Sequence, residues 1–498
     1  MSRYKSFLRQ RYRAIFGYTG LVCIISGLGI LSPLIALIFY PQEVSLAWAF
    51  LIPGIILSAV GFILWRSLAP KKATSLTLQE GAVIVVLSWL VAIVVGTVPL
   101  MLVQGLNFTQ AMFESTSGWT TTGLSVVDVT KASRLILLYR STIELFGGAG
   151  LAIITLSAIS HAAAPNAGPS GSGLTSAEGR TEQLVPNVRR SAKLVLAIYL
   201  GYIIVGTIAL NLAGMSFFDA VNHSFAAVST GGFSTRPESI GYWDNTAVEV
   251  VTNILMILGA LNFVTSYMLL TGKFKSVMRN GEIRLQFFLY VLCSIILFFG
   301  VILPLYPNLG KAIRVSIFET ITALSTTGFS TVGYTDWNGL GWLILILLML
   351  IGGGSGSTAG GIKQIRIYIL YRALMWEIRR MLMPSGAVNE AHIWQGDKRQ
   401  FLQNDQLKQI SIFVFLYLMI FGIGSAIIAA HGYTLQESLF EYASAMGTVG
   451  LSVGVTAADA APSLLWAETV GMFLGRLEFF TVFVGLVRLL RDTRPILA

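Results

Sequence analysis

Four copies of one short pattern, T-x-G-[LF]-S, recur along this chain of 498 residues, at 121–125, 230–234, 326–330 and 448–452. Each copy lies between strongly apolar segments. One polypeptide therefore carries four equivalent quarters of a ring. Rings of backbone carbonyls at membrane depth replace the hydration shell of a cation and select among cations.

The composition places these motifs in a membrane. Mean hydropathy is +0.72, and 54% of the residues are hydrophobic while only 12% are charged, which is too apolar for a soluble globular protein. Apolar runs of about the 20 residues needed to cross hydrocarbon occur at 14–40, 46–68, 82–104, 135–158, 192–213, 247–270, 286–306, 340–380, 408–430 and 464–490. We predict an all-α integral membrane protein with ten spans, the eighth of them interrupted.

Basic residues orient the predicted spans. Five Lys and Arg residues precede the first run and no small-residue cleavage site follows it, so we expect it to remain as a membrane helix. Most of the 34 Lys and Arg residues then collect on one side, which the positive-inside rule makes cytoplasmic. Both termini are predicted inside and all four motifs outside. The net charge of +10 is a topology signal and predicts no nucleic-acid partner.

Each motif ends a short segment, at 108–120, 217–229, 312–325 and 436–447, that is too short and too polar to span. Such segments are typical of re-entrant half-helices followed by an extended return. Nine residues before the central glycine stand Glu114, Glu319 and Glu441, with His223 in the second copy. These glutamates either concentrate cations at the outer mouth or anchor the half-helix N-termini, and we favour the second role.

The motif backbones are the candidate cation site. A central glycine lets the backbone turn its carbonyls toward an axis and lets four segments approach closely. Close helix packing is the alternative explanation for such glycines, but four copies on one side of the membrane favour a ring. The predicted cation-binding filter consists of Thr121, Thr122, Gly123, Thr230, Gly231, Gly232, Thr326, Thr327, Gly328, Thr448, Val449 and Gly450.

A glycine-rich run interrupts the eighth apolar segment. Each glycine costs a helix roughly 1 kcal/mol relative to alanine, so the helix must break there. The spacing does not fit a phosphate-binding loop, because Lys363 comes two residues after the last glycine and no strand precedes the run. The run consists of Gly352, Gly353, Gly354, Ser355, Gly356, Ser357, Thr358, Ala359, Gly360 and Gly361.

Arg476 follows Gly450, the filter glycine of its own repeat, by about as many residues as the glycine-rich run follows Gly328. Both are therefore expected at about the same depth below the filter. An arginine inside a membrane almost always faces a cavity or a partner. A pair with Glu478 or Glu468 is the alternative, but residues two apart on a helix point away from each other. We predict that Arg476 and the glycine-rich run form a gate beneath the filter.

These features resemble the Trk/Ktr/HKT superfamily of potassium transporters, and most closely its TrkH-like members. The resemblance covers essentially the whole chain and rests on the four motifs, the run from Gly352 to Lys363, Arg476 and two extra N-terminal spans. It implies a homodimer in a bacterial inner membrane, with one potassium pore per protomer and cytoplasmic nucleotide-binding regulatory subunits of the TrkA type. It implies no cofactor bound by this chain. In plant relatives a serine at the first filter glycine accompanies sodium permeation, so Gly123 favours potassium.

The predicted architecture is four pseudo-symmetric helix–pore-loop–helix units around one pore. The sections are 1–72 (two N-terminal transmembrane helices), 73–160 (pore unit 1), 161–285 (a cytoplasmic loop and pore unit 2), 286–383 (pore unit 3 with an interrupted inner helix) and 384–498 (a cytoplasmic linker and pore unit 4).

Potassium uptake through a gated cation-selective pore is the predicted function. The alternative is a secondary active transporter that couples potassium to proton or sodium movement. Carriers of that kind usually show inverted repeats and midplane carboxylates, whereas these repeats share one orientation and no carboxylate triad stands at mid-depth. The sequence contains no constellation of nucleophile, base or metal ligands that indicates an enzyme.

Overall fold

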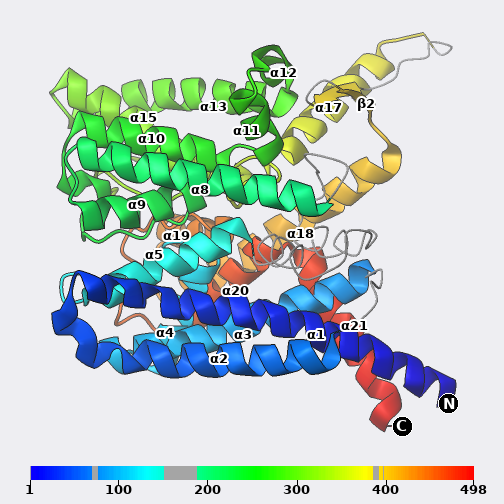
Figure 1. The fold of residues 1–498 in the computed structure, drawn as a ribbon. Helices are drawn as coiled ribbons and strands as arrows, with labels where there is room; N and C mark the ends of the chain where they lie inside the picture. The colour runs from blue at the N-terminus through cyan, green and yellow to red at the C-terminus, as the bar shows by residue number, and fades with distance from the viewer. Residues whose placement is uncertain (1, 70–76, 151–187, 385–391, 396–397, 498) are drawn as a thin grey trace.

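The computed structural model describes residues 2–69, 77–150, 188–384, 392–395 and 398–497. Its long helices lie side by side, and the two ends of the chain lie near each other (Figure 1). An N-terminal pair, α1 (Ser2–Leu31) and α2 (Trp48–Leu68), is joined by the 3-10 helices η1 (Ser32–Ile38) and η2 (Pro41–Leu46). This pair precedes the repeated part of the chain.

The same order of elements then occurs four times: a long helix, a short buried helix, an extended segment and a further helix. We call these successions units 1 to 4. Unit 1 contains α3 (Leu78–Gln104), α4 (Phe108–Trp119) and α5 (Arg134–Ala149); unit 2 contains α8 (Val188–Leu212), α9 (Phe217–Ser229), η3 (Ser239–Tyr242), α10 (Thr246–Ala260), α11 (Phe263–Leu270) and α12 (Phe274–Arg279). Unit 3 contains α13 (Gly281–Leu297), η4 (Phe298–Ile302), α14 (Leu303–Leu305), α15 (Leu309–Ser325), α16 (Gly339–Ile351) and α17 (Gln364–Met381); unit 4 contains α18 (Asn404–Ala429), α19 (Leu435–Gly447), α20 (Pro462–Leu477) and α21 (Phe479–Leu497).

The short helices α4, α9, α15 and α19 lie within three residues of the half-helices that the sequence predicts. Each begins at a residue whose side chain accepts a hydrogen bond from a backbone N–H of the first turn, and these N-caps are Asn107, Ser216, Asn308 and Thr434. A cap of this kind satisfies one of the four donors that a helix start leaves free. The four N-cap residues are exposed, so these helices begin at the surface, and their later turns are buried.

Within the described ranges, six helices are long and apolar enough to cross a membrane, or eight if each of two bent pairs counts as one span. The sequence-based set of ten also counted α5 and the segment that contains α16 and α17. The rest of the run predicted over 135–158, and the loop predicted to precede unit 2, lie outside the described residues after Gly150.

The break expected in the eighth segment is present, since α16 ends at Ile351 and α17 begins at Gln364. Only the eighth span was predicted to be interrupted, but those over 247–270 and 464–490 are broken as well. α10 and α11 meet at 117° and α20 and α21 at 100°. Asn262 caps a new helix by accepting the N–H of Val264, and Glu478 has a φ of 58°, which no right-handed helix accommodates.

Among the described residues, the strands form one two-stranded antiparallel hairpin, β1 (His392–Gln395) with β2 (Lys398–Phe401). It lies beside α17, at the end of the molecule where the chain termini also lie (Figure 1). Buried Ile369, Ile393 and Ile410 form one apolar cluster. This cluster ties α17 to the hairpin and to α18.

Candidate functional site

The four motifs adopt one backbone conformation. The threonine two residues before the central glycine has a φ between 51° and 55° in all four units, and the glycine itself has a φ between 84° and 98°. Left-handed backbone is uncommon for threonine. The N–H of the residue between them bonds to the carbonyl five residues earlier, as in Thr122 to Ser117 at 2.8 Å and Val449 to Ser444 at 2.9 Å. Each short helix therefore ends in the same turn.

The central glycines lie against one another in cyclic order. A β-carbon added to any of them would collide with a backbone carbonyl oxygen of the next unit, so only glycine fits. The pairs are Gly123 with Gly231, Gly232 with Thr327, Gly328 with Val449, and Gly450 with Thr122. The four predicted filter segments thus form a closed ring.

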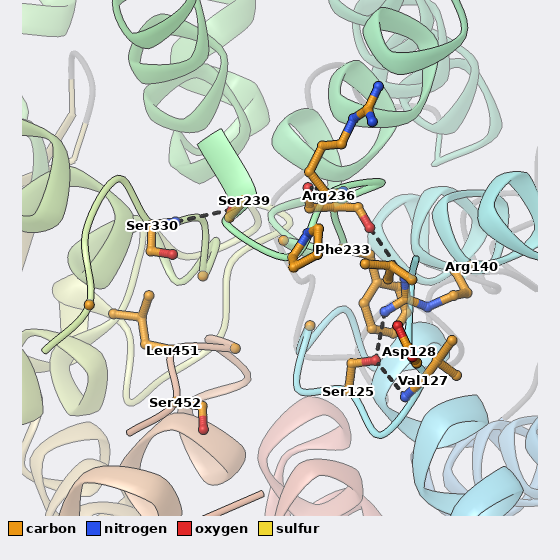
Figure 2. A pocket seen from close by; sticks show the side chains of 18 of the residues that line it. Ser125, Val127, Asp128, Arg140, Phe233, Arg236, Ser239, Ser330, Leu451 and Ser452 are labelled. Atoms are coloured by element: carbon orange, nitrogen blue, oxygen red, sulfur yellow. Dashed lines mark hydrogen bonds between the residues drawn. The ribbon is translucent and has the colours of Figure 1, made fainter. Parts of the chain in front are cut away.

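A cavity of about 380 Å³ adjoins this ring, and all four central glycines line it together with the four motif serines. Figure 2 shows labelled residues from every unit around it, among them Ser125, Phe233, Ser330 and Ser452. Asp128 also lines the cavity. Hydrogen bonds from Thr130 and Lys131 lower the pKa of Asp128 to about 2, so this carboxylate is ionised at neutral pH.

In units 1, 3 and 4, a fully buried glutamate holds the chain that returns after the motif. Glu114 accepts the N–H of Val126 at 2.9 Å, and the equivalent bonds run from Thr331 to Glu319 at 2.9 Å and from Val453 to Glu441 at 3.1 Å. The expectation that these carboxylates anchor the half-helix N-termini is wrong. They project from mid-helix, where the N–H groups of their own helix are already paired, and so they bind the neighbouring extended segment.

Unit 2 departs from this arrangement. Its histidine, His223, takes the place of the glutamate, with Nδ1 2.8 Å from the carbonyl oxygen of Asp219 and Nε2 3.0 Å from the hydroxyl of Ser234. A neutral imidazole satisfies both contacts by donating from Nδ1 and accepting at Nε2. The histidine therefore reaches the motif serine, and the glutamates of units 1 and 4 accept from the corresponding Ser125 and Ser452.

The glycine-rich segment, residues 352–361, lies directly against the ring. The N–H of Gly360 donates to the hydroxyl of Thr326 at 2.7 Å, and a β-carbon on Gly360 would collide with Thr448 Oγ1 and the carbonyl of Gly447. The hydroxyl of Thr358 contacts the carbonyl oxygen of Val228 at 3.1 Å. The segment thus touches the ends of the short helices of units 2, 3 and 4.

Arg476 connects this segment to unit 1. Its guanidinium donates to the carbonyl oxygen of Thr358 at 2.5 Å and to that of Gly147 at 2.6 Å. The acidic residues considered as its partners bind elsewhere: the carboxylate of Glu478 pairs with Arg366 at 2.8 Å, and Glu468 accepts from the hydroxyl of Thr456 at 3.1 Å. The structure therefore brings Arg476 and the glycine-rich run together, as the sequence predicts.

Comparison with known families agrees with this geometry. A family model for TrkH, described as a cation transport protein, matches residues 47–493. The chain belongs to the TrkH family. This family consists of transport proteins, which agrees with the lack of any sequence pattern for an enzyme.

Several relatives of this TrkH-family chain match along nearly their whole length. An uncharacterised cation transporter of Methanocaldococcus jannaschii is 33% identical over 93% of this chain and 93% of its own. The Trk system potassium uptake protein TrkH of Escherichia coli K12 is 31% identical over 95% of this chain and 98% of its own. The crystal structure of the potassium transporter TrkH from Vibrio parahaemolyticus superposes with a TM-score of 0.80 at 27% identity, covering 96% of this chain and 98% of that one.

Sequence reasoning missed roles for Arg140 and Glu144 on α5 of this TrkH-family chain. Arg140, only 2% exposed, binds Glu114 at 2.7 Å, and Glu144, fully buried, accepts the N–H of Phe233 at 3.0 Å. The sequence did contain an indication of these roles, because the two charged residues stand one helical turn apart in an otherwise apolar run. Their partners lie in other elements, and the sequence does not reveal them.

Proposed function

We propose that this chain is the pore-forming subunit of a potassium uptake system, with a gated and cation-selective pathway. The observation that carries the proposal is the closed ring of glycine-to-carbonyl contacts among the four motifs. A ring of backbone carbonyls can replace the hydration shell of a cation. Relatives named potassium uptake proteins match over most of the chain, which supports potassium as the ion. The filter consists of residues 121–123, 230–232, 326–328 and 448–450.

The gate consists of residues 352–361 and Arg476. The segment contacts the filter ends of three units, and Arg476 closes the fourth side through the carbonyls of Thr358 and Gly147. A guanidinium has five donors and does not lose its charge. It can therefore hold several carbonyls and repel a cation at the same time. Withdrawal of the segment opens the pathway.

The units proposed to surround the pore are 73–160, 161–285, 286–383 and 384–498, after the N-terminal pair in 1–72. The multi-pass chain lies in the inner membrane with both termini in the cytoplasm, as a homodimer above TrkA-like nucleotide-binding subunits. α17 starts directly after Lys363 and packs on the β1–β2 hairpin and α18 through the cluster of Ile369, Ile393 and Ile410. A partner that moves this cluster would pull on the gate.

Reversal potentials of purified protein in liposomes test the pore against coupled transport. Opposing potassium and proton gradients are imposed, and the potential of zero current is measured. A pore predicts a reversal potential that follows the potassium gradient alone. A reversal potential that shifts when only the proton or sodium gradient changes would overturn the pore and favour the coupled transporter.

A further inference from the structure

Unit 2 lacks two residues that the other units share. Units 1, 3 and 4 have phenylalanine ten residues before the central glycine and glutamate nine before it, whereas unit 2 has Asn222 and His223. The glutamates bind the N–H groups of the returning chain in their own units. Unit 2 has no carboxylate at that position, and its returning chain is held by Asp219, which accepts a hydrogen bond from the hydroxyl of Thr235.

Helix α5 of unit 1 contacts unit 2 nearby through three residues, two of them at the motif itself. The hydroxyl of Ser141 donates to Asn222 Oδ1 at 2.7 Å, and Arg140 Nη1 donates to the carbonyl oxygen of Ser234 at 3.3 Å. One turn further along, Glu144 Oε1 accepts the N–H of Phe233 at 3.0 Å. Residues 140, 141 and 144 lie on one face of a helix, so a single surface of α5 contacts unit 2.

These contacts lie at the back of the filter itself. The guanidinium carbon of Arg140 is 3.9 Å from the centre of the Phe233 ring, and Figure 2 shows the two side chains together at the wall of the cavity. A β-carbon on Gly231 would collide with the carboxyl carbon of Glu144. Glu144 therefore packs directly against the filter segment of unit 2.

The bond to Phe233 fixes the direction of a filter carbonyl. The peptide between Gly232 and Phe233 is trans, so its N–H and its C=O point in opposite directions. Because the N–H points back to Glu144, the carbonyl of Gly232 points away from α5. A wrong rotation of this peptide would turn one of the four central carbonyls around.

We propose that Arg140 and Glu144 are positioning residues for ion selectivity, which set the filter backbone of unit 2 from unit 1. This inference rests on the proposed filter. The corresponding offsets in the other units hold Asn253, Met349 and Gly471 in place of Glu144, and Glu249, Leu345 and Ala467 in place of Arg140. The paired arrangement is therefore confined to α5 and to the filter segment that departs from the others.

The test is the permeability ratio of potassium to sodium for Glu144→Leu, Glu144→Gln and the matched control Asn253→Leu, in liposomes. Glu144→Leu removes the acceptor of the buried N–H of Phe233 and leaves that group unpaired. We expect the permeability ratio of this variant to fall about tenfold. The glutamine keeps an acceptor oxygen and should restore most of the ratio. Asn253→Leu should leave it unchanged. An unchanged ratio in Glu144→Leu overturns the inference.

A second pair of variants tests the same contact if Glu144→Leu does not fold. Gly231→Ala pushes against the Glu144 carboxyl carbon, and Glu144→Ala removes it. Since both changes break the same contact, the double variant should lower the permeability ratio by about as much as either single variant. A double variant whose ratio falls by the product of the two single effects would overturn the inference. The filter is assessed separately with Gly232→Ser: if that variant changes the ratio while the Glu144 variants do not, the filter stands and the positioning role fails.

Discussion

The proposed filter ring has two faces that are built on opposite rules, an outer face toward the cavity and an inner face against the glycine-rich segment. On the outer face, all four units contribute the same glycine-to-carbonyl contact and the same motif serine. On the inner face, one segment from unit 3 and one arginine from unit 4 contact all four units. Repetition produces the ring, and single copies produce the structure that covers it.

This difference matches what each face is proposed to do. Coordination of a bare cation needs several carbonyls at one distance, which equivalent units supply. A gate needs two arrangements of one element, and a segment held to other elements by separate hydrogen bonds can release them together. Substitutions on the outer face should therefore change which ion passes, and those on the inner face should change how often it passes.

The largest effect is expected at the filter glycines. Serine at Gly232 or Gly328 places a β-carbon against the carbonyl of Thr327 or Val449 and adds a hydroxyl that competes for the ion, so the ratio of potassium to sodium permeability should fall about a hundredfold. Gly333→Ser is the matched control, because Gly333 lines the same cavity and a β-carbon there meets no atom within 4 Å. Equal ratios in the filter variants and the control would remove the distinction between the two faces.

A smaller effect is expected on the inner face. Arg476→Ala removes charged hydrogen bonds to Thr358 and Gly147. The loss of one such bond, about 1.5 kcal/mol at the low end of its range, is enough to raise the basal potassium flux without regulatory subunits about tenfold. The permeability ratio should stay the same. Arg488→Ala is the control, because it removes an equal charge that pairs with Asp492 on α21. Unchanged basal flux in a correctly inserted Arg476→Ala protein would place the gate elsewhere.

Sequence alone predicted the repeated face well, because local rules determine it. Short polar segments between apolar runs, followed by a motif glycine, indicated α4, α9, α15 and α19 and the turns that end them. The glycine-rich run and Arg476 were also visible, since glycines inside an apolar run and a lone charge are strong departures from a helical span.

The contacts between units could not be predicted in this way. The bends at Asn262 and Glu478 depend on one cap and one left-handed residue, which hydropathy does not register. The binding of Glu114 to Val126, and of Glu144 to Phe233, depends on which elements pack together. A glutamate in the middle of a short helix indicates that a partner exists and does not identify it.

The smallest effect is expected at the glutamates behind the ring. Glu441→Ala leaves the buried N–H groups of Val453 and Thr456 without their acceptor, which should lower the free energy of unfolding by about 2 kcal/mol. Glu319→Ala should cost a similar amount, because it holds Thr331 in the same way. Thermal melting of the purified proteins measures both, with exposed Asp459→Ala as control. Clearly unequal losses of stability in the two variants would show that units 3 and 4 are not equivalent in energy, although their backbones are alike.

The most direct test of the division between the two faces measures two quantities in one preparation. Gly232→Ser and Arg476→Ala proteins are reconstituted side by side, and the permeability ratio and the basal potassium flux are determined for each. We expect Gly232→Ser to lower the permeability ratio without raising the basal flux, and Arg476→Ala to raise the basal flux at an unchanged ratio. A fall of the ratio in Arg476→Ala as large as that in Gly232→Ser would contradict the division between the two faces.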